Sequence, residues 1–131
     1  MKTKLLIVIV AILLSTSGAF AQKAEPNRIK FAKGKTAATV TGTLSNNQEM
    51  DYVFSAKAGQ KVTLKVSSNP KGYLFSFSVK GDGEIELETE LDSYDDYTFT
   101  APETGDYLVF VTKRPTEKVP KAKFLLTLSV K

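Results

Sequence analysis

The side chains that most often catalyse reactions or bind transition metals are missing from this chain. Its 131 residues contain no histidine and no cysteine. Their absence excludes Ser-His-Asp and Cys-His catalysis, and it removes the usual ligands of zinc and copper. The segment 81–84 (GDGE) lacks the strand-to-helix context that a phosphate-binding loop needs. Carboxylates, lysines and two arginines are therefore the groups left for chemistry or for recognition.

The carboxylates gather in one part of the sequence. Ten acidic residues and no basic one lie between Asp82 and Asp106. Calcium takes six to eight oxygen ligands, and closely spaced aspartates can supply them. No segment has the D-x-[DN]-x-[DN]-G spacing of a calcium loop. Two interpretations stay open, a solvated acidic face or a calcium site whose candidate ligands are Asp82, Asp92, Asp95 and Asp96.

Basic residues follow directly after the acidic block. From residue 113 to the end there are six basic residues and one acidic residue, Glu117. Most lie on or beside a proline-containing connection between two predicted strands, and loops on a rigid β scaffold often carry recognition residues. Arg114 precedes Pro115, which favours an extended backbone and an outward guanidinium. The connection is either a binding loop or a stretch of ordinary surface charge that keeps the protein soluble and protects an edge strand. Its candidate partner-binding residues are Lys113, Arg114, Lys118 and Lys121.

One aromatic residue is a further candidate for partner binding. The period-two alternation that follows it places Phe75 and Phe77 on the core side of a strand. Tyr73 is then the exposed member of this aromatic group, so we include it with the basic loop in the predicted partner-binding site.

The first 21 residues have the pattern of a secretory signal peptide. Lys2 and Lys4 precede an apolar run over 5–14, and Ala19-Phe20-Ala21 fits a cleavage site. The run is shorter than the roughly 20 residues that span a bilayer. We therefore expect a signal peptide over 1–21, a single domain over 22–131, a periplasmic or secreted location and no membrane insertion after cleavage.

Charge gives little support for a nucleic-acid partner. The whole chain has a formal net charge of +4 and loses two lysines with the leader, which leaves +2. That value is too small to indicate nucleic-acid binding by itself.

The mature part of the chain has the pattern of a β protein. Apolar and polar residues alternate in nine runs bounded by turn-forming residues, which is typical of a β-sandwich. The runs cover 28–31, 38–44, 52–56, 62–66, 75–79, 84–90, 97–101, 107–111 and 124–130. The turn Pro102–Gly105 predicts that the runs on either side form a central hairpin. We predict an all-β fold, an antiparallel, jelly-roll-like β-sandwich of eight to nine strands.

Four segments together resemble two related bacterial groups. They are RIKFAKGKTAATVTGTL, DYVFSAKAGQKVTLKV, YTFTAPETGDYLVFV and KFLLTLSV, and they cover nearly all of the mature chain. One group is the pre-peptidase C-terminal domain, a β-sandwich module, and the other is the periplasmic inhibitor of g-type lysozyme. The resemblance implies a β-sandwich. For the inhibitors it also implies an arginine-rich loop, between the last two strands, that enters the substrate cleft of the lysozyme.

The basic connection corresponds by position to that inhibitor loop. Lys113 and Arg114 match its start, and Lys118 lies near a second arginine position. This chain differs in carrying a single arginine there, together with Glu117 and two prolines.

The expected function is therefore that of a non-enzymatic binding protein without cofactor. Its partner would be a g-type lysozyme, engaged through the basic loop. The alternative is a generic pre-peptidase-type module that binds an envelope polysaccharide or another extracellular polymer or protein, with calcium as an optional aid.

Overall fold

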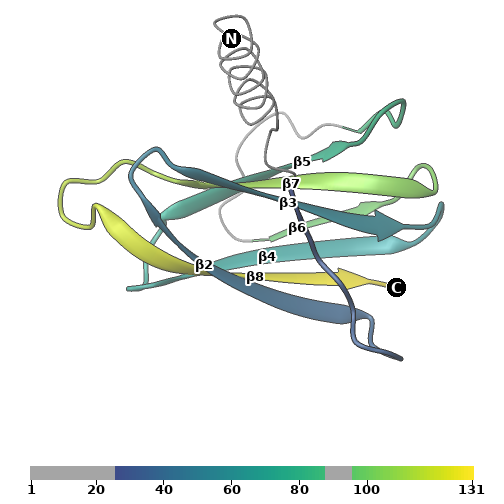
Figure 1. Cartoon of the computed structure of the whole chain (residues 1–131), viewed down its shortest axis with the longest axis horizontal. Helices are drawn as coiled ribbons and strands as arrows, with labels where there is room; N and C mark the ends of the chain where they lie inside the picture. The colour runs from purple at the N-terminus through teal and green to yellow at the C-terminus, as the bar shows by residue number, and fades with distance from the viewer. Residues whose placement is uncertain (1–25, 88–95) are drawn as a thin grey trace, which may run out of the picture.

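The computed structural model describes residues 26–87 and 96–131, which form eight β-strands in two facing sheets (Figure 1). One sheet has the order β1-β3-β7-β5 and the other β2-β8-β4-β6, and only the β1–β3 pairing is parallel. The predicted all-β sandwich is confirmed. The strands are β1 (Asn27–Arg28), β2 (Ala37–Ser45), β3 (Glu49–Ala56), β4 (Lys61–Asn69), β5 (Phe75–Gly81), β6 (Asp96–Thr100), β7 (Gly105–Lys113) and β8 (Lys121–Val130). Within the two described ranges, no helix has the length and apolar character needed to cross a membrane.

The strands alternate between the sheets along the chain. Odd-numbered strands form one sheet and even-numbered strands the other, so every connection passes from sheet to sheet. The predicted central hairpin is therefore wrong, because β6 pairs with β4 whereas β7 pairs with β3 and β5. The turn after β6 instead leads from one sheet to the other at the edge of the core. There Ala101 is buried and bonds to the β3–β4 turn, through Gly59 N to Ala101 O at 2.9 Å and Ala101 N to Gln60 O at 2.8 Å.

The predicted strand over 84–90 is also not formed in its described part. Residues 84–87 lie outside any strand, and 88–90 are outside the described residues. The chain folds back on the end of β5, where Gly81 N donates to Leu87 O at 2.8 Å. Ile85 occupies the space that a side chain at Gly81 would need. The described part of this segment therefore folds back over Gly81 and does not form the extended strand that the alternation predicted.

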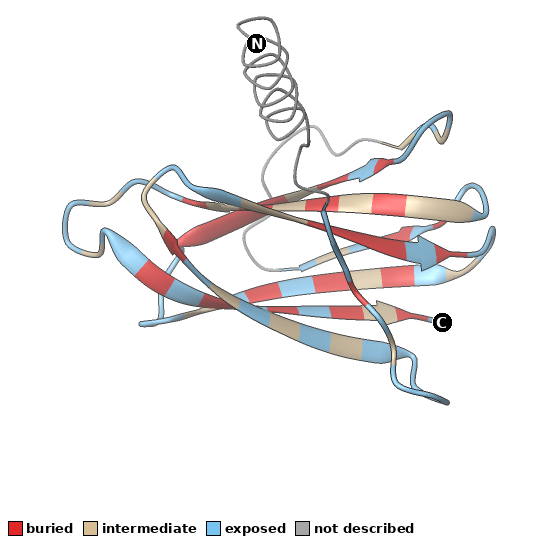
Figure 2. Ribbon diagram, viewed as in Figure 1, coloured by how far each residue is buried: buried red, intermediate tan, exposed pale blue. Residues whose placement is uncertain are grey.

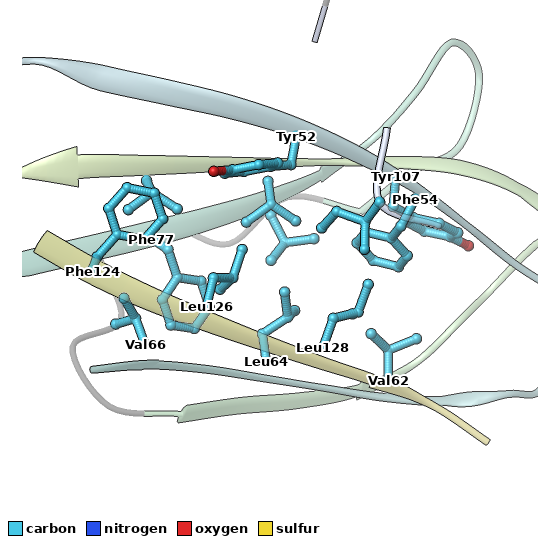
Figure 3. Close-up of a cluster of buried hydrophobic side chains, with 14 of the residues drawn as sticks. Tyr52, Phe54, Val62, Leu64, Val66, Phe77, Tyr107, Phe124, Leu126 and Leu128 are labelled. Carbon is cyan, nitrogen blue, oxygen red and sulfur yellow. The ribbon is translucent and has the colours of Figure 1, made fainter. Parts of the chain in front are cut away.

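Apolar side chains from both sheets fill the space between them (Figure 3). Buried residues alternate with more exposed ones along strands such as β4 and β8 (Figure 2). Phe124 of β8 has no exposed surface, and its ring meets Tyr52 and Phe75 of the opposite sheet at centroid distances of 6.3 and 5.3 Å. On β2, Gly42 lies opposite Phe124, and a Cβ at this position would come within 2.7 Å of the ring. Edge-to-face aromatic packing of this kind stabilises a core beyond the area that it buries.

A charged cluster fastens the short N-terminal strand to the first sheet. Arg28 Nη2 donates to Asp106 Oδ2 at 2.8 Å and Nη1 to Asp106 Oδ1 at 3.2 Å. Ser55 Oγ donates to the same carboxylate at 2.8 Å and accepts from Arg28 Nη1 at 3.1 Å. Hydrogen bonds from Arg28 and Ser55 lower the pKa of Asp106 below its ordinary value. This cluster ties β1, β3 and β7 together.

We expect the Asp106 cluster to make folding stability depend on pH in acid. Because the pKa of Asp106 is lower in the folded chain, the unfolded chain binds more protons in acid. The resulting stabilisation is complete above the unfolded pKa of about 4 and is lost as the pH falls through the lower folded pKa. Thermal melts of Asp106→Asn and Arg28→Gln should therefore both show a shallower fall of Tm below pH 5 than the wild-type chain. Wild-type pH dependence in both variants would refute this assignment.

Candidate functional site

Three connections lie at the same end of the sandwich. They are the β2–β3 turn (46–48), the β4–β5 connection (70–74) and the β7–β8 loop (114–120), at the left of Figure 1. The strand register places them together, because Lys121 pairs with Ser45, Asn69 with Lys123, and Phe75 with Lys113. The basic loop predicted from the sequence therefore protrudes from one end of a rigid scaffold, between two other connections.

The β2–β3 turn holds one side of the 114–120 loop. Asn46 N donates to Pro120 O at 2.9 Å, and Asn47 N donates to Lys113 O at 3.0 Å. The Asn46 amide also bonds to Thr116 twice, from Nδ2 to Thr116 O at 2.8 Å and from Thr116 N to Oδ1 at 3.1 Å. Val119 is partly buried and packs against the core. The loop is therefore fixed at its start, its middle and its end.

The β4–β5 connection holds the other side of the loop. Arg114 N donates to Leu74 O at 2.9 Å, and Arg114 Nη1 donates to Tyr73 O at 2.9 Å. Two of the predicted partner-binding residues, Arg114 and Tyr73, are thus in direct contact. Tyr73 has 63% of its surface exposed, which agrees with the sequence-based expectation. Lys118 and Lys121 are exposed as well, further along the loop and at the start of β8.

Lys113 does not belong to this exposed surface, which corrects the prediction for that residue. It continues the inward-facing series of β7 after Tyr107, Val109 and Val111, and its side chain has no exposed surface. Its ammonium donates to Asn46 Oδ1 at 2.9 Å, to Arg114 O at 2.6 Å and to Thr116 Oγ1 at 3.4 Å. Burial, followed by the nearby Arg114 charge, lowers the pKa of Lys113.

A depression adjoins the loop on the side of Tyr73. Its volume is about 450 Å³, and it is lined by Tyr73, Gly72 and Lys71 of the β4–β5 connection and by β4 residues that include Lys65 and Ser68. Ser68 Oγ shapes the connection by bonding to Pro70 O and Gly72 O, each at 2.9 Å. The depression therefore brings two lysines, Lys65 and Lys71, to the same hollow as Tyr73.

Two carboxyl groups on β3 lie close to this end, and the sequence analysis did not single them out. Burial, then a hydrogen bond with Asp51 and its charge, raises the pKa of Glu49. Glu49 pairs with Thr112 beside the start of the loop. A raised pKa means that the Glu49 carboxyl group carries less negative charge in mild acid, and therefore offsets less of the positive charge of the loop.

The structure gives no support for the calcium candidates that it describes. Asp82 and Asp96 are exposed, and residues 26–87 and 96–131 contain no group of three or more side chains suited to hold a metal ion. Asp92 and Asp95 lie outside the described residues.

Comparison with known proteins relates the chain to one family in particular. No family model matches the chain. The inhibitor of g-type lysozyme from Escherichia coli K12 is 30% identical over 129 residues, which cover 95% of this chain and 93% of that protein. Two solved structures share the fold. The periplasmic g-type lysozyme inhibitor PliG of Aeromonas hydrophila has a TM-score of 0.65 at 22% identity and covers 81% of this chain and 96% of its own. The pre-peptidase C-terminal domain of a Bacillus anthracis collagenase has a TM-score of 0.58 at 18% identity and covers 84% and 98%.

Some of these comparisons support the fold only, and one also identifies the family. The likeness to the collagenase domain concerns the sandwich alone, since its sequence identity is low. The likeness to the Escherichia coli inhibitor extends over nearly the full length of both sequences. The chain therefore belongs to the family of g-type lysozyme inhibitors.

Proposed function

We propose that the chain is a non-enzymatic inhibitor of g-type lysozyme that binds the enzyme through the 114–120 loop and Tyr73. The observation that carries the proposal is the loop itself. It presents Arg114 and Lys118 to solvent while hydrogen bonds hold it to connections on both sides. Family membership supports the same function, because the Escherichia coli relative is an inhibitor of this class of lysozyme.

The chemistry of the loop fits an acidic cleft. Glycoside hydrolases act through carboxyl side chains that flank the scissile bond. Arg114 offers a planar guanidinium that can bind a carboxylate through two parallel hydrogen bonds, whereas Lys118 offers a point charge. The Arg114–Tyr73 contact limits the freedom of the guanidinium before binding. A loop that is already ordered loses less conformational entropy in a complex, which favours affinity.

The location of the relatives agrees with this function. The Aeromonas hydrophila and Salmonella Typhimurium proteins are periplasmic lysozyme inhibitors. The leader predicted over 1–21 directs this chain to the same compartment or beyond it.

Calorimetric titration of a g-type lysozyme with residues 22–131 tests complex formation. We expect a one-to-one complex whose affinity falls between low and high salt, because exposed charges across the interface are screened. A c-type lysozyme serves as the control enzyme and should give no heat of binding. Absence of a complex with the g-type enzyme at micromolar concentrations would overturn the proposal.

A further inference from the structure

The buried end of Lys113 is the centre of a polar network that sequence analysis did not anticipate. All three protons of its ammonium have an oxygen acceptor, namely Asn46 Oδ1, Arg114 O and Thr116 Oγ1. The acceptors come from two connections that are far apart in the sequence, the β2–β3 turn and the 114–120 loop. A cation without exposed surface is costly unless its donors are satisfied, so each of these contacts matters for the local structure.

The side chains of Thr116 and Asn46, which bind Lys113, also make other hydrogen bonds. Thr116 Oγ1 donates to Val119 O at 2.8 Å and accepts from Val119 N at 3.3 Å, in addition to Lys113. Asn46 uses its Oδ1 and Nδ2 on Lys113 and Thr116. Buried networks in which every member is satisfied specify one conformation, whereas incomplete ones do not. The network therefore links Lys113, the last residue of β7, to the start, middle and end of the loop.

From this arrangement we infer that Lys113 is a positioning residue, whose buried ammonium fixes the loop conformation that presents Arg114 and Lys118 to the lysozyme. The inference rests on the proposed function for its partner. Lys113 itself contacts no lysozyme, because its side chain is covered. Lys113 instead positions the backbone of Arg114, because its ammonium donates to the carbonyl oxygen of that residue at 2.6 Å.

Hydrogen exchange of the free protein tests the ordering of the loop without any lysozyme. Lys113→Met removes the ammonium and keeps an unbranched side chain of similar length. We expect faster exchange of the Thr116 and Val119 amides in Lys113→Met, by at least about tenfold, with unchanged exchange in the central strands. Lys61→Met, an exposed lysine at the other end of the sandwich, is the matched control and should leave the loop amides unchanged. Unchanged Thr116 and Val119 exchange in Lys113→Met would overturn the inference.

A double-mutant cycle tests the effect on binding. Lys113→Met should weaken binding to a g-type lysozyme by at least about tenfold in the wild-type background. In an Arg114→Ala/Lys118→Ala background it should weaken binding by less than about threefold, because the residues that it positions are gone. A merely structural role would give equal losses in both backgrounds, and that outcome would contradict the inference.

A second pair of variants covers the case in which Lys113→Met fails to fold. Thr116→Ser keeps the hydroxyl that links Lys113 to Val119, whereas Thr116→Val removes it with little change of shape. Thr116→Ser should bind like the wild-type chain, and Thr116→Val should bind about tenfold more weakly. Equal affinity of the two variants would also count against the network. If the wild-type chain binds no g-type lysozyme, the proposed function fails, and the exchange of the free protein still decides whether the network orders the loop.

Discussion

Arg114→Ala combined with Lys118→Ala is expected to weaken the complex with a g-type lysozyme by about 100-fold, or about 3 kcal/mol. Both side chains are exposed on a loop whose backbone is fixed by other residues. Their removal should therefore abolish charge contacts with the enzyme while leaving the loop in place. Arginine dominates many interfaces because its guanidinium combines a flat surface with several donors, so Arg114→Ala alone should account for most of the loss.

The matched control for this prediction lies at the opposite end of the molecule. Lys57→Ala with Lys61→Ala removes the same net charge from exposed positions beside the β3–β4 turn. This control should reduce affinity by less than about threefold, since it changes only the long-range field. Similar losses in the two double variants would mean that net charge, and not the loop, governs binding. Both double variants should melt within a few degrees of the wild-type chain.

Tyr107→Ala is expected to lower the free energy of unfolding by about 3–5 kcal/mol, a large share of the stability of a small domain. Tyr107 has no exposed surface and stacks on Phe54 of its own sheet at 5.6 Å. It also contacts Phe99 of the opposite sheet, at 5.8 Å between ring centroids. Its hydroxyl donates to Glu103 O at 2.6 Å and thereby closes the connection between β6 and β7. Truncation removes a contact between the sheets and leaves a cavity.

Denaturant unfolding of two further variants separates the two contributions of this side chain. Tyr107→Phe keeps the ring and loses the hydroxyl, and it should cost only about 1 kcal/mol. Tyr73→Ala removes a largely exposed aromatic side chain and should cost less than about 1 kcal/mol. If Tyr107→Ala were no more destabilising than Tyr73→Ala, the role assigned to Tyr107 in the core would be wrong.

The sequence was sufficient to predict most of the strands and the inward-facing residues of these strands, although not the segment over 84–90. Alternation identified Phe75 and Phe77 as core residues and Tyr73 as exposed, and the structure confirms each. The reason is that one sheet face is buried and the other solvated, so side-chain polarity follows the period of the strand. For the same reason, the alternation over Tyr107, Val109 and Val111 already placed Lys113 on the inner face. Its basic neighbours obscured that signal.

The sheet to which each strand belongs was not predictable from local pattern. A turn such as Pro102–Gly105 can join two strands of one sheet or pass between two sheets, and its residues are compatible with both. The choice depends on the strands with which β6 and β7 pair, namely β3, β4 and β5. Most of the paired residues are separated by 30 or more positions along the chain. The polar network around Lys113 was hidden for a similar reason, because Asn46 is separated from it by 67 residues.

The most direct test of the proposed function is inhibition of cell-wall lysis by purified residues 22–131 against g-type, c-type and i-type lysozymes. Inhibition confined to the g-type enzyme, and lost in Arg114→Ala/Lys118→Ala, is the predicted result. Undiminished lysis by the g-type enzyme at micromolar protein, or equal inhibition by the wild-type chain and the double variant, would contradict a lysozyme inhibitor that acts through the 114–120 loop.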